Sequence, residues 1–165
     1  WPSLTERFHV TGAVVASSAV HRGVGLCAGL DASDPAESGD EPFKAMASTV
    51  LDEFAKRDFV YVHASLSDEV VHGSDMNATV RAIEAFDRDL VGPILEGLAK
   101  KGPYRFLALC DHGEGVQGQA FAVFGEGSGK DGAAGGRRFT ESDAQASKAP
   151  VRDASKFVIK LFAKG

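Results

Sequence analysis

The sequence predicts an α/β protein with a mainly parallel sheet and helices on both faces. Short runs rich in β-branched and aromatic residues alternate along the chain with longer stretches whose apolar residues recur at helical spacing. Several of the short runs are nearly continuous in apolar residues, as in strands that are covered on both faces. Clusters of glycine, proline and acidic residues separate the two kinds of segment. Such alternation is typical of a parallel sheet whose strands are connected by helices.

The length and the net charge of the chain limit the class of protein to which it can belong. The 165 residues suit one domain, so we expect a single α/β domain over residues 1–165. Eighteen Lys and Arg residues against 23 Asp and Glu residues give a net charge of −5. This balance argues against a dedicated nucleic-acid binder, which normally carries a basic patch. No apolar run approaches the roughly 20 residues that span a bilayer. The chain opens on Trp1 without an initiator methionine, so we expect a fragment, a processed product or part of something longer.

The first elements follow from local patterns. Residues 10–16 predict a short buried strand, because β-branched residues cluster there. Residues 19–30 contain three glycines and predict a short helix that packs closely on its neighbours. The acidic stretch at 31–41 predicts a surface loop. Pro42 then opens a helix, whose apolar residues share one face: Phe43, Met46, Val50, Leu51 and Phe54.

The middle of the chain carries the clearest strand and the longest helix. Residues 58–65 predict a strand covered on both faces, and Ser74 or Asp75 can cap the helix that follows. An apolar stripe continues along that helix to residue 98. Pro93 inside it predicts a kink or a break at Gly92.

The last third is predicted to add two strands and a closing helix. The strands fall at 104–110 and 120–124, with a glycine-rich turn between them. A helix over 154–163 closes the chain. The two cysteines, Cys27 and Cys110, are too few for a disulfide framework and have small or apolar neighbours. They predict buried free thiols in a reducing compartment, the cytoplasm or an organelle matrix.

Carboxylates and imidazoles follow two of the predicted strands. In open α/β sheets, functional groups collect in the loops at the carboxyl ends of strands. If the strands at 58–65 and 104–110 are neighbours, the groups after them converge on one sheet edge. Carboxylate and imidazole together suit a divalent ion of the zinc or manganese type. The candidate metal ligands are Asp68, His72, Asp111 and His112.

Simpler interpretations stand beside this one. Asp68 could cap a turn, and His72 could be a solvated loop residue. His63 lies within a strand and could be a hydrogen-bonded core histidine. The segment 125–131 lacks the register of a phosphate-binding loop, so we expect a connection there. Arg22 follows the first strand and could contact a phosphate group.

Several of these segments together resemble a known family. The run 59–75, continuing through 82–87 to 91–95, is similar to the archaeal-type branch of the cofactor-independent phosphoglycerate mutases, in the alkaline phosphatase superfamily. The similarity covers nearly the whole chain. Its further segments are 2–3, 11–15, 22–25, 28–30, 111–112, 121–125, 139–141 and the predicted terminal helix. The resemblance covers only the C-terminal half of an enzyme more than twice as long.

The resemblance implies an alkaline-phosphatase-like fold, present in part, and a glycolytic phosphoryl transfer between 2-phosphoglycerate and 3-phosphoglycerate. It implies two divalent metals, manganese or zinc, with Asp68 and His72 on one ion and Asp111 and His112 on the other. Arg22 would bind the phosphorylated small-molecule substrate. The serine nucleophile would lie in the absent half, so the resemblance places no catalytic residue in this chain.

One departure from the family pattern leaves alternatives open. The family has another metal-binding histidine shortly before the strand predicted at 120–124, whereas the segment 113–119 contains none. Glu114 could replace it as an oxygen ligand. The chain is therefore the C-terminal part of a phosphoglycerate mutase-like enzyme, a degenerate relative with a structural or interaction role and lost metals, or another phosphotransferase or phosphohydrolase. In each case we expect this chain to be inactive alone and to need a partner chain or an N-terminal segment.

Overall fold

The computed structural model describes residues 2–35, 41–65, 75–109 and 121–125, and the single positions Lys156, Phe157, Ile159 and Phe162. The chain forms two compact units, Trp1–Lys100 and Lys101–Gly165, and each is described by itself. That all 165 residues act as one domain stays a prediction.

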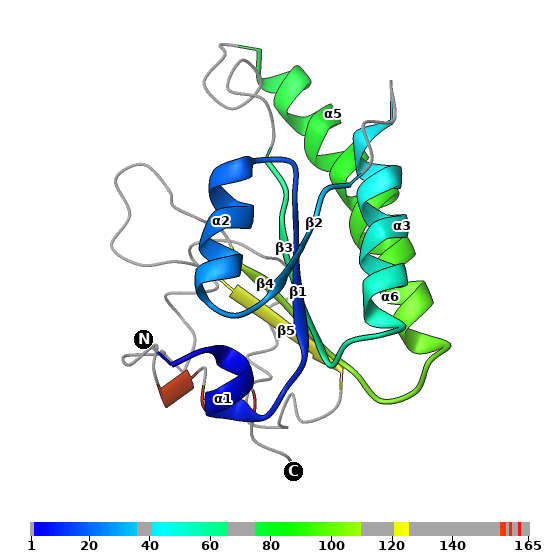
Figure 1. Ribbon diagram of the computed structural model, residues 1–165. Coiled ribbons are helices and arrows are strands. Elements are labelled where there is room, and N and C mark those ends of the chain that lie inside the picture. Colours follow the sequence, from blue (N-terminus) through cyan, green and yellow to red (C-terminus); the bar gives the residue numbers. More distant parts are fainter. Residues whose placement is uncertain are drawn as a thin grey trace. The chain divides into compact units, whose positions relative to one another are not determined.

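A three-stranded parallel sheet lies at the centre of the first unit (Figure 1). Strand β1 (Gly12–Ala16) lies between β2 (Asp31–Ser33) and β3 (Phe59–His63). The parallel sheet and its strands β1 and β3 confirm the prediction, but β2 lies where a surface loop was expected. Its three residues carry no apolar pattern, so only their backbone pairing with β1 makes them a strand.

Strand β1 is the buried strand of this sheet, as predicted. All five of its residues are buried. Strand β3 is half-buried, and its Tyr61 is 43% exposed, so the prediction that β3 is covered on both faces is wrong. Tyr61 pairs with Val14 and therefore shares its face of the sheet. On that face, helix α2 lies over β1 and β2 and leaves Tyr61 open.

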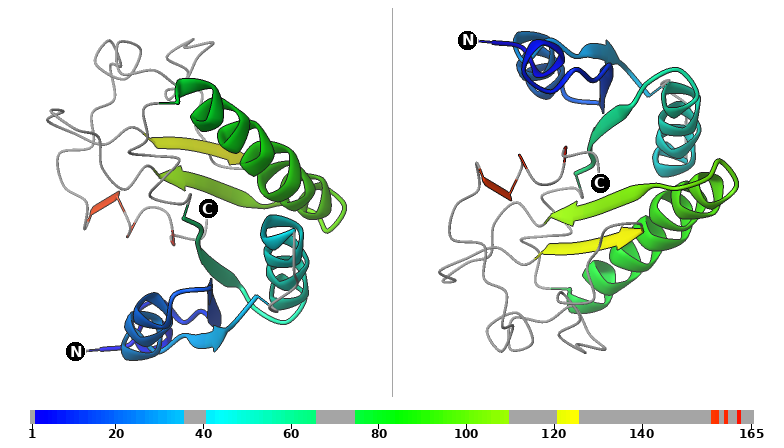
Figure 2. Two further views of the ribbon diagram at one scale, coloured as in Figure 1. Left: turned by 90° about the horizontal axis from the view of Figure 1, so that it is seen from above. Right: turned by 90° about the horizontal axis from the view of Figure 1, so that it is seen from below.

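Helices cover both faces of the sheet, which confirms the predicted architecture. Helix α2 (Ala19–Cys27) lies on one side and α3 (Pro42–Phe54) on the other (Figure 2). Pro42 occupies the first turn of α3, where its missing N–H group costs nothing. The face of α3 that meets the sheet and the next helices buries Met46 and Val50.

The predicted long helix is interrupted where proline requires it. Helix α5 (Met76–Phe86) passes through a π-helical turn, η1 (Asp87–Val91), into α6 (Gly92–Ala99). The carboxylate of Asp75 caps α5 by accepting hydrogen bonds from two backbone N–H groups, at 2.9 and 3.2 Å. Pro93 cannot donate a backbone hydrogen bond, so the α-helical ladder breaks just before it.

The first helix, α1 (Leu4–Phe8), was not predicted. Its start is a capping box: the Ser3 hydroxyl accepts from the N–H of Glu6 at 3.1 Å, and the Glu6 carboxylate accepts from the N–H of Ser3 at 2.9 Å. The pattern Ser-x-x-Glu is a known signal for a helix start, so the sequence did contain the evidence for α1.

In the second unit, β4 (Arg105–Leu109) pairs antiparallel with β5 (Phe121–Gly125). Both strands lie where the sequence predicted them. The four described positions between Lys156 and Phe162 are helical, as the predicted closing helix requires.

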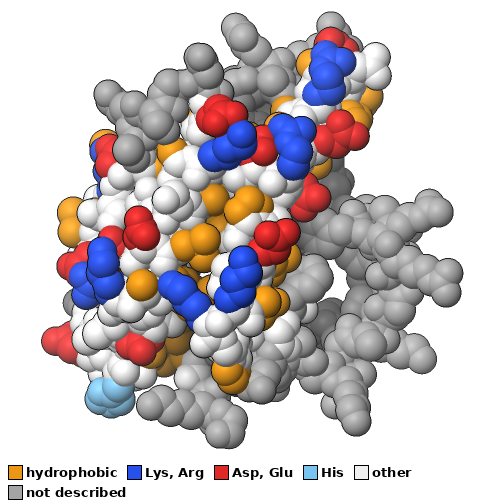
Figure 3. Space-filling model, turned by 90° about the vertical axis from the view of Figure 1, so that its right-hand side faces the viewer, with side chains coloured by type: hydrophobic (Ala, Val, Ile, Leu, Met, Phe, Trp, Pro, Cys, Tyr) orange, Lys and Arg blue, Asp and Glu red, His pale blue; other side chains and the backbone are white. Residues whose placement is uncertain are grey.

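The described surface of the first unit mixes charges of both signs. On the face turned to the viewer in Figure 3, basic and acidic side chains alternate around apolar ones. Several charged side chains of the first unit form local ion pairs, such as Lys44 with Glu41 at 2.5 Å and Arg88 with Asp89 at 2.6 Å. Within the described ranges, no helix is long and apolar enough to cross a membrane.

Candidate functional site at the carboxyl edge of the sheet

The candidate site lies at the carboxyl edge of the parallel sheet. Strands β1, β2 and β3 end there at Ala16, Ser33 and His63. Only two residues separate the end of β1 from the start of α2. Because the three strands are parallel, the segments that leave them start side by side. This is the edge at which α/β sheets place their functional groups.

Arg22 lies at this edge, where the sequence placed it. Its Nη1 donates to the carbonyl oxygens of Ala16 and Ser17, both at 2.7 Å, and forms an ion pair with Asp34 at 2.9 Å. The side chain is 23% exposed. Arg22 therefore links the end of β1 to the residue that follows β2. Its predicted contact with a substrate stays a prediction.

His21, the residue before Arg22, stacks on His63. The two ring centroids lie 3.4 Å apart and the ring planes are tilted by 18°. The Nδ1 atom of His21 is buried and has no hydrogen-bond partner among the described residues. His63 was predicted as a possible core histidine, whereas it is half-buried at a strand end. The contact between His21 and His63 was not predicted, because no sequence pattern links a residue in the first turn of a helix to a strand residue 42 positions later.

The four predicted metal ligands lie outside the described residues. They are Asp68, His72, Asp111 and His112. The segment with the first two leaves the carboxyl end of β3, and the other two follow β4. Within the described part of the chain, no three His, Cys, Asp or Glu side chains gather to hold a metal ion. By donor chemistry, two carboxylates and two imidazoles fit a divalent ion of the manganese or zinc type.

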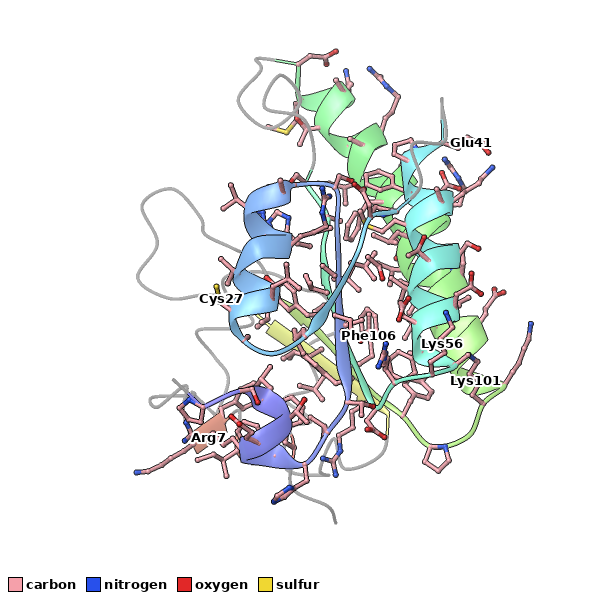
Figure 4. All side chains as sticks on the ribbon, in the orientation of Figure 1. Arg7, Cys27, Glu41, Lys56, Lys101 and Phe106 are labelled. Carbon is pink, nitrogen blue, oxygen red and sulfur yellow. The ribbon has the colours of Figure 1, made fainter. Side chains whose placement is uncertain are left out.

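Cys27 corrects a further prediction. It ends α2 and is an exposed free thiol, not a buried one, and its side chain points away from the sheet (Figure 4). The helix turns a different residue, Gly25, towards β1, which leaves Cys27 on the outer side. Cys110 lies outside the described residues.

Comparison with known proteins shows which family and which relatives this chain is similar to. The family described as "Metalloenzyme superfamily" matches residues 38–120, which is half of the chain and includes all four predicted ligands. A chain of Geobacter sulfurreducens named "Probable 2,3-bisphosphoglycerate-independent phosphoglycerate mutase" is 38% identical over 113 residues. A protein of Methanothrix thermoacetophila named "2,3-bisphosphoglycerate-independent phosphoglycerate mutase" is 35% identical over 115 residues. Each match covers 67% of this chain but only 28% and 29% of the relatives, so this chain spans less than a third of their length.

A solved structure supports the fold. The cofactor-independent phosphoglycerate mutase from Thermoplasma acidophilum aligns with 98% of this chain and 39% of its own, with a TM-score of 0.60 and 17% identity. The expected partial alkaline-phosphatase-like α/β fold is thereby confirmed. Together with the family match over residues 38–120, this places the chain in the metalloenzyme superfamily.

Proposed function

We propose that this chain takes part in metal-dependent phosphoryl transfer of the 2-phosphoglycerate/3-phosphoglycerate mutase type and supplies the C-terminal part of the site. The observation that carries the proposal is the family match over residues 38–120, together with relatives named as phosphoglycerate mutases. The match includes the stretches of sequence that follow β3 and β4, and these contain the four candidate ligands.

In this proposal Asp68, His72, Asp111 and His112 hold two divalent metals. When bound, such ions neutralise the phosphoryl oxygens and lower the pKa of the attacking hydroxyl. The serine nucleophile belongs to the part of the relatives that this chain does not span, so this chain alone is inactive. A cytoplasmic location is part of the same proposal.

Arg22 would bind the phosphorylated substrate. Its Nη1 is fixed by two carbonyl oxygens and by Asp34, so the guanidinium is already oriented at the carboxyl edge. A guanidinium has five N–H donors, and those on Nη2 and Nε are separate from the anchored nitrogen. An anchored cation loses little side-chain freedom when it pairs with a phosphate.

Metal binding tests the proposal most directly. After loading with Mn²⁺ or Zn²⁺, elemental analysis of the chain is expected to find bound metal. His72→Ala is expected to weaken metal affinity by more than about tenfold and to leave the unfolding free energy of the metal-free protein unchanged. His9→Asn is the matched control, because it removes an exposed histidine from a left-handed position that asparagine tolerates. A chain that retains no metal after loading would contradict the proposal.

The alternative is a degenerate relative that serves as a structural or interaction subunit. The absence of histidine from the segment 113–119 favours it, because the resembled family has a metal-binding histidine there. Two metals per chain after loading would exclude this alternative, and their absence would support it. The intact mass of the protein in its source cells decides whether the chain is part of a longer product.

Exposed apolar side chains support the need for a further segment. Two helical stripes of the first unit are 46–73% exposed, with apolar residues three or four positions apart along much of their length. Their members are Val20, Val24 and Leu26 on α2 and Met76, Val80 and Ile83 on α5. Exposed apolar patches mark interaction surfaces. We propose that these stripes contact the N-terminal segment present in the longer relatives.

Mixing experiments test this contact. The N-terminal part of the Geobacter sulfurreducens relative, expressed separately, is expected to form a 1:1 complex with this chain in analytical ultracentrifugation. Val24→Glu and Ile83→Glu are expected to prevent the complex, whereas Lys44→Glu on α3 is not. Self-association of this chain through the same positions, without a complex, would contradict the proposed occupant.

A further inference from the structure

Contacts of two different kinds hold Arg22 at the carboxyl edge. Its Nη1 donates to the carbonyl oxygens of Ala16 and Ser17, which belong to the backbone at the end of β1 and just after it. The same nitrogen pairs with Oδ2 of Asp34 at 2.9 Å. The carbonyl oxygens are fixed by the end of a fully buried strand, whereas the Asp34 carboxylate belongs to a side chain that can rotate away.

The two carbonyl oxygens are enough to orient Arg22. A guanidinium has five N–H donors, and each terminal nitrogen carries two of them. On Nη1 of Arg22, two carbonyl oxygens at 2.7 Å can use both hydrogens. The carboxylate of Asp34 is therefore a third acceptor on a nitrogen that already has two. Its main effect is to neutralise the charge of the guanidinium.

The Asp34 side chain is held more loosely than that of Arg22. It is 53% exposed, against 23% for Arg22. The pairing of β2 with β1 ends at Ser33, so the sheet does not hold the backbone of Asp34. Within the described ranges, Arg22 is the one cation that pairs with this carboxylate. Ion pairs with an exposed partner contribute little to stability, so another anion can replace Asp34 readily.

The remaining donors of Arg22 are on Nη2 and Nε. They have no hydrogen-bond partner among the residues that the structure describes. A phosphate oxygen that accepts from them would share one small cation with Asp34. The two anions would then lie well within the Debye length of about 10 Å at 0.1 M salt, so screening would not remove their repulsion.

We infer that Asp34 is an internal competitor for the anion site of Arg22. It occupies the guanidinium when no ligand is present, lowers the affinity for a phosphate group and moves away when one binds. This inference rests on the proposed function, in which Arg22 binds the phosphorylated substrate, and it adds how that contact is regulated. The ligand class is an oxyanion of the phosphate type.

The sign of one substitution tests the inference. Binding of inorganic phosphate to the whole chain is followed by NMR, through the backbone amide signals around Arg22, at neutral pH and constant ionic strength. Asp34→Asn keeps the shape of the side chain and removes its charge. It is expected to tighten phosphate binding by about two- to fivefold. If Asp34 instead serves to orient Arg22, the same substitution weakens binding.

Two further variants control for charge and for location. Asp31→Asn removes the same charge from the first residue of β2, where Asp31 pairs with Arg57, and is expected to leave the phosphate affinity unchanged. Arg22→Lys is expected to abolish binding, because one ammonium group cannot hold the two carbonyl oxygens and also contact a phosphate. Phosphate binding that survives Arg22→Lys would lie elsewhere and would contradict the inference.

The outcomes separate the inference from the proposed function. Tighter binding in Asp34→Asn but not in Asp31→Asn supports the competitor role. Equal affinity of wild type and Asp34→Asn, or an equal gain in both asparagine variants, overturns that role and leaves Arg22 as an anion site. If neither wild type nor Asp34→Asn binds phosphate, the inference and the proposed role of Arg22 are both wrong. Metal loading tests the rest of the proposed function independently.

The order of the Arg22 side chain gives a readout that needs no ligand. Because the two carbonyl oxygens hold Nη1, the NMR order parameter of the Arg22 Nε–H bond is expected to stay at its wild-type value in Asp34→Asn. A large fall of this order parameter would show that Asp34 holds the side chain in place, and the competitor role would be wrong.

Discussion

Gly25 of α2 lies directly against Val14 of β1. A Cβ atom on Gly25 would meet Cγ1 of Val14 and would lie 2.7 Å from its Cβ. The helix can approach the buried strand this closely only because the residue at the contact has no side chain.

Substitution of the two glycines inside α2 is therefore expected to have opposite effects. Gly25→Ala forces the helix away from β1, and we expect a loss of about 1–3 kcal/mol in the free energy of unfolding. Gly23→Ala meets no described atom within 4 Å and replaces a poor helix former, so we expect a gain of about 0.5–1 kcal/mol. Urea unfolding measures both. Equal effects of the two changes would contradict the close packing.

Two leucines on helices are expected to differ by their burial. Leu98 of α6 is 2% exposed, and Leu98→Ala is expected to cost about 2–5 kcal/mol in urea unfolding, because it leaves a cavity. Leu26 of α2 is 58% exposed, and Leu26→Ala is expected to change stability by less than about 0.5 kcal/mol. Leucine and alanine are both good helix formers, so helix propensity does not account for the difference. A costly Leu26→Ala would show that its exposed face is covered.

The capping box of α1 predicts a pH dependence. The backbone N–H of Ser3, followed by its hydroxyl, lowers the pKa of Glu6 below its ordinary value of 4.5. A lowered pKa in the folded state favours the carboxylate there, so the stabilisation is present above pH 4.5 and is lost as the pH falls through the folded pKa.

NMR titration of the Glu6 side-chain carboxyl carbon checks this sign. The midpoint of this titration is expected below pH 4.5. Glu6→Gln removes the titrating carboxyl, so the helicity of α1 is expected to lose the pH dependence that this group causes. A midpoint at or above 4.5 would show that the capping box does not persist in solution.

The exposed thiol of Cys27 predicts a chemical reactivity. In the Cys110→Ser variant, Cys27 is expected to react with a thiol reagent in the native protein about as fast as in urea, because its side chain needs no unfolding to be reached. Cys27→Ser with Cys110 retained is the companion variant and is expected to lack this native-state reaction phase. Protection of Cys27 in the native chain would contradict its exposure.

Most of the regular elements could be predicted, because their signals are local. The β-branched run of β1, Pro42 at the start of α3 and the Asp75 cap of α5 are each visible within a few residues. Pro93 marked the break of the long helix for the same reason. The capping box of α1 was also visible and was overlooked.

Features that depend on distant partners could not be predicted. Strand β2 has no strand-like pattern and exists through its pairing with β1. The exposure of Tyr61 depends on which strands α2 covers. The stacking of His21 on His63 joins residues from two separate elements, and no spacing rule connects them.

The sequence by itself determined the α/β class, the order of its main elements and the resemblance that led to the metalloenzyme superfamily. These depend on periodicity, caps, breakers and motifs, which act over a few residues. Only the tertiary structure decided that Arg22 is anchored between two strand ends and that His21 lies against His63. Contacts of this kind arise when packing brings together side chains far apart in the chain, and local propensity carries no information about them.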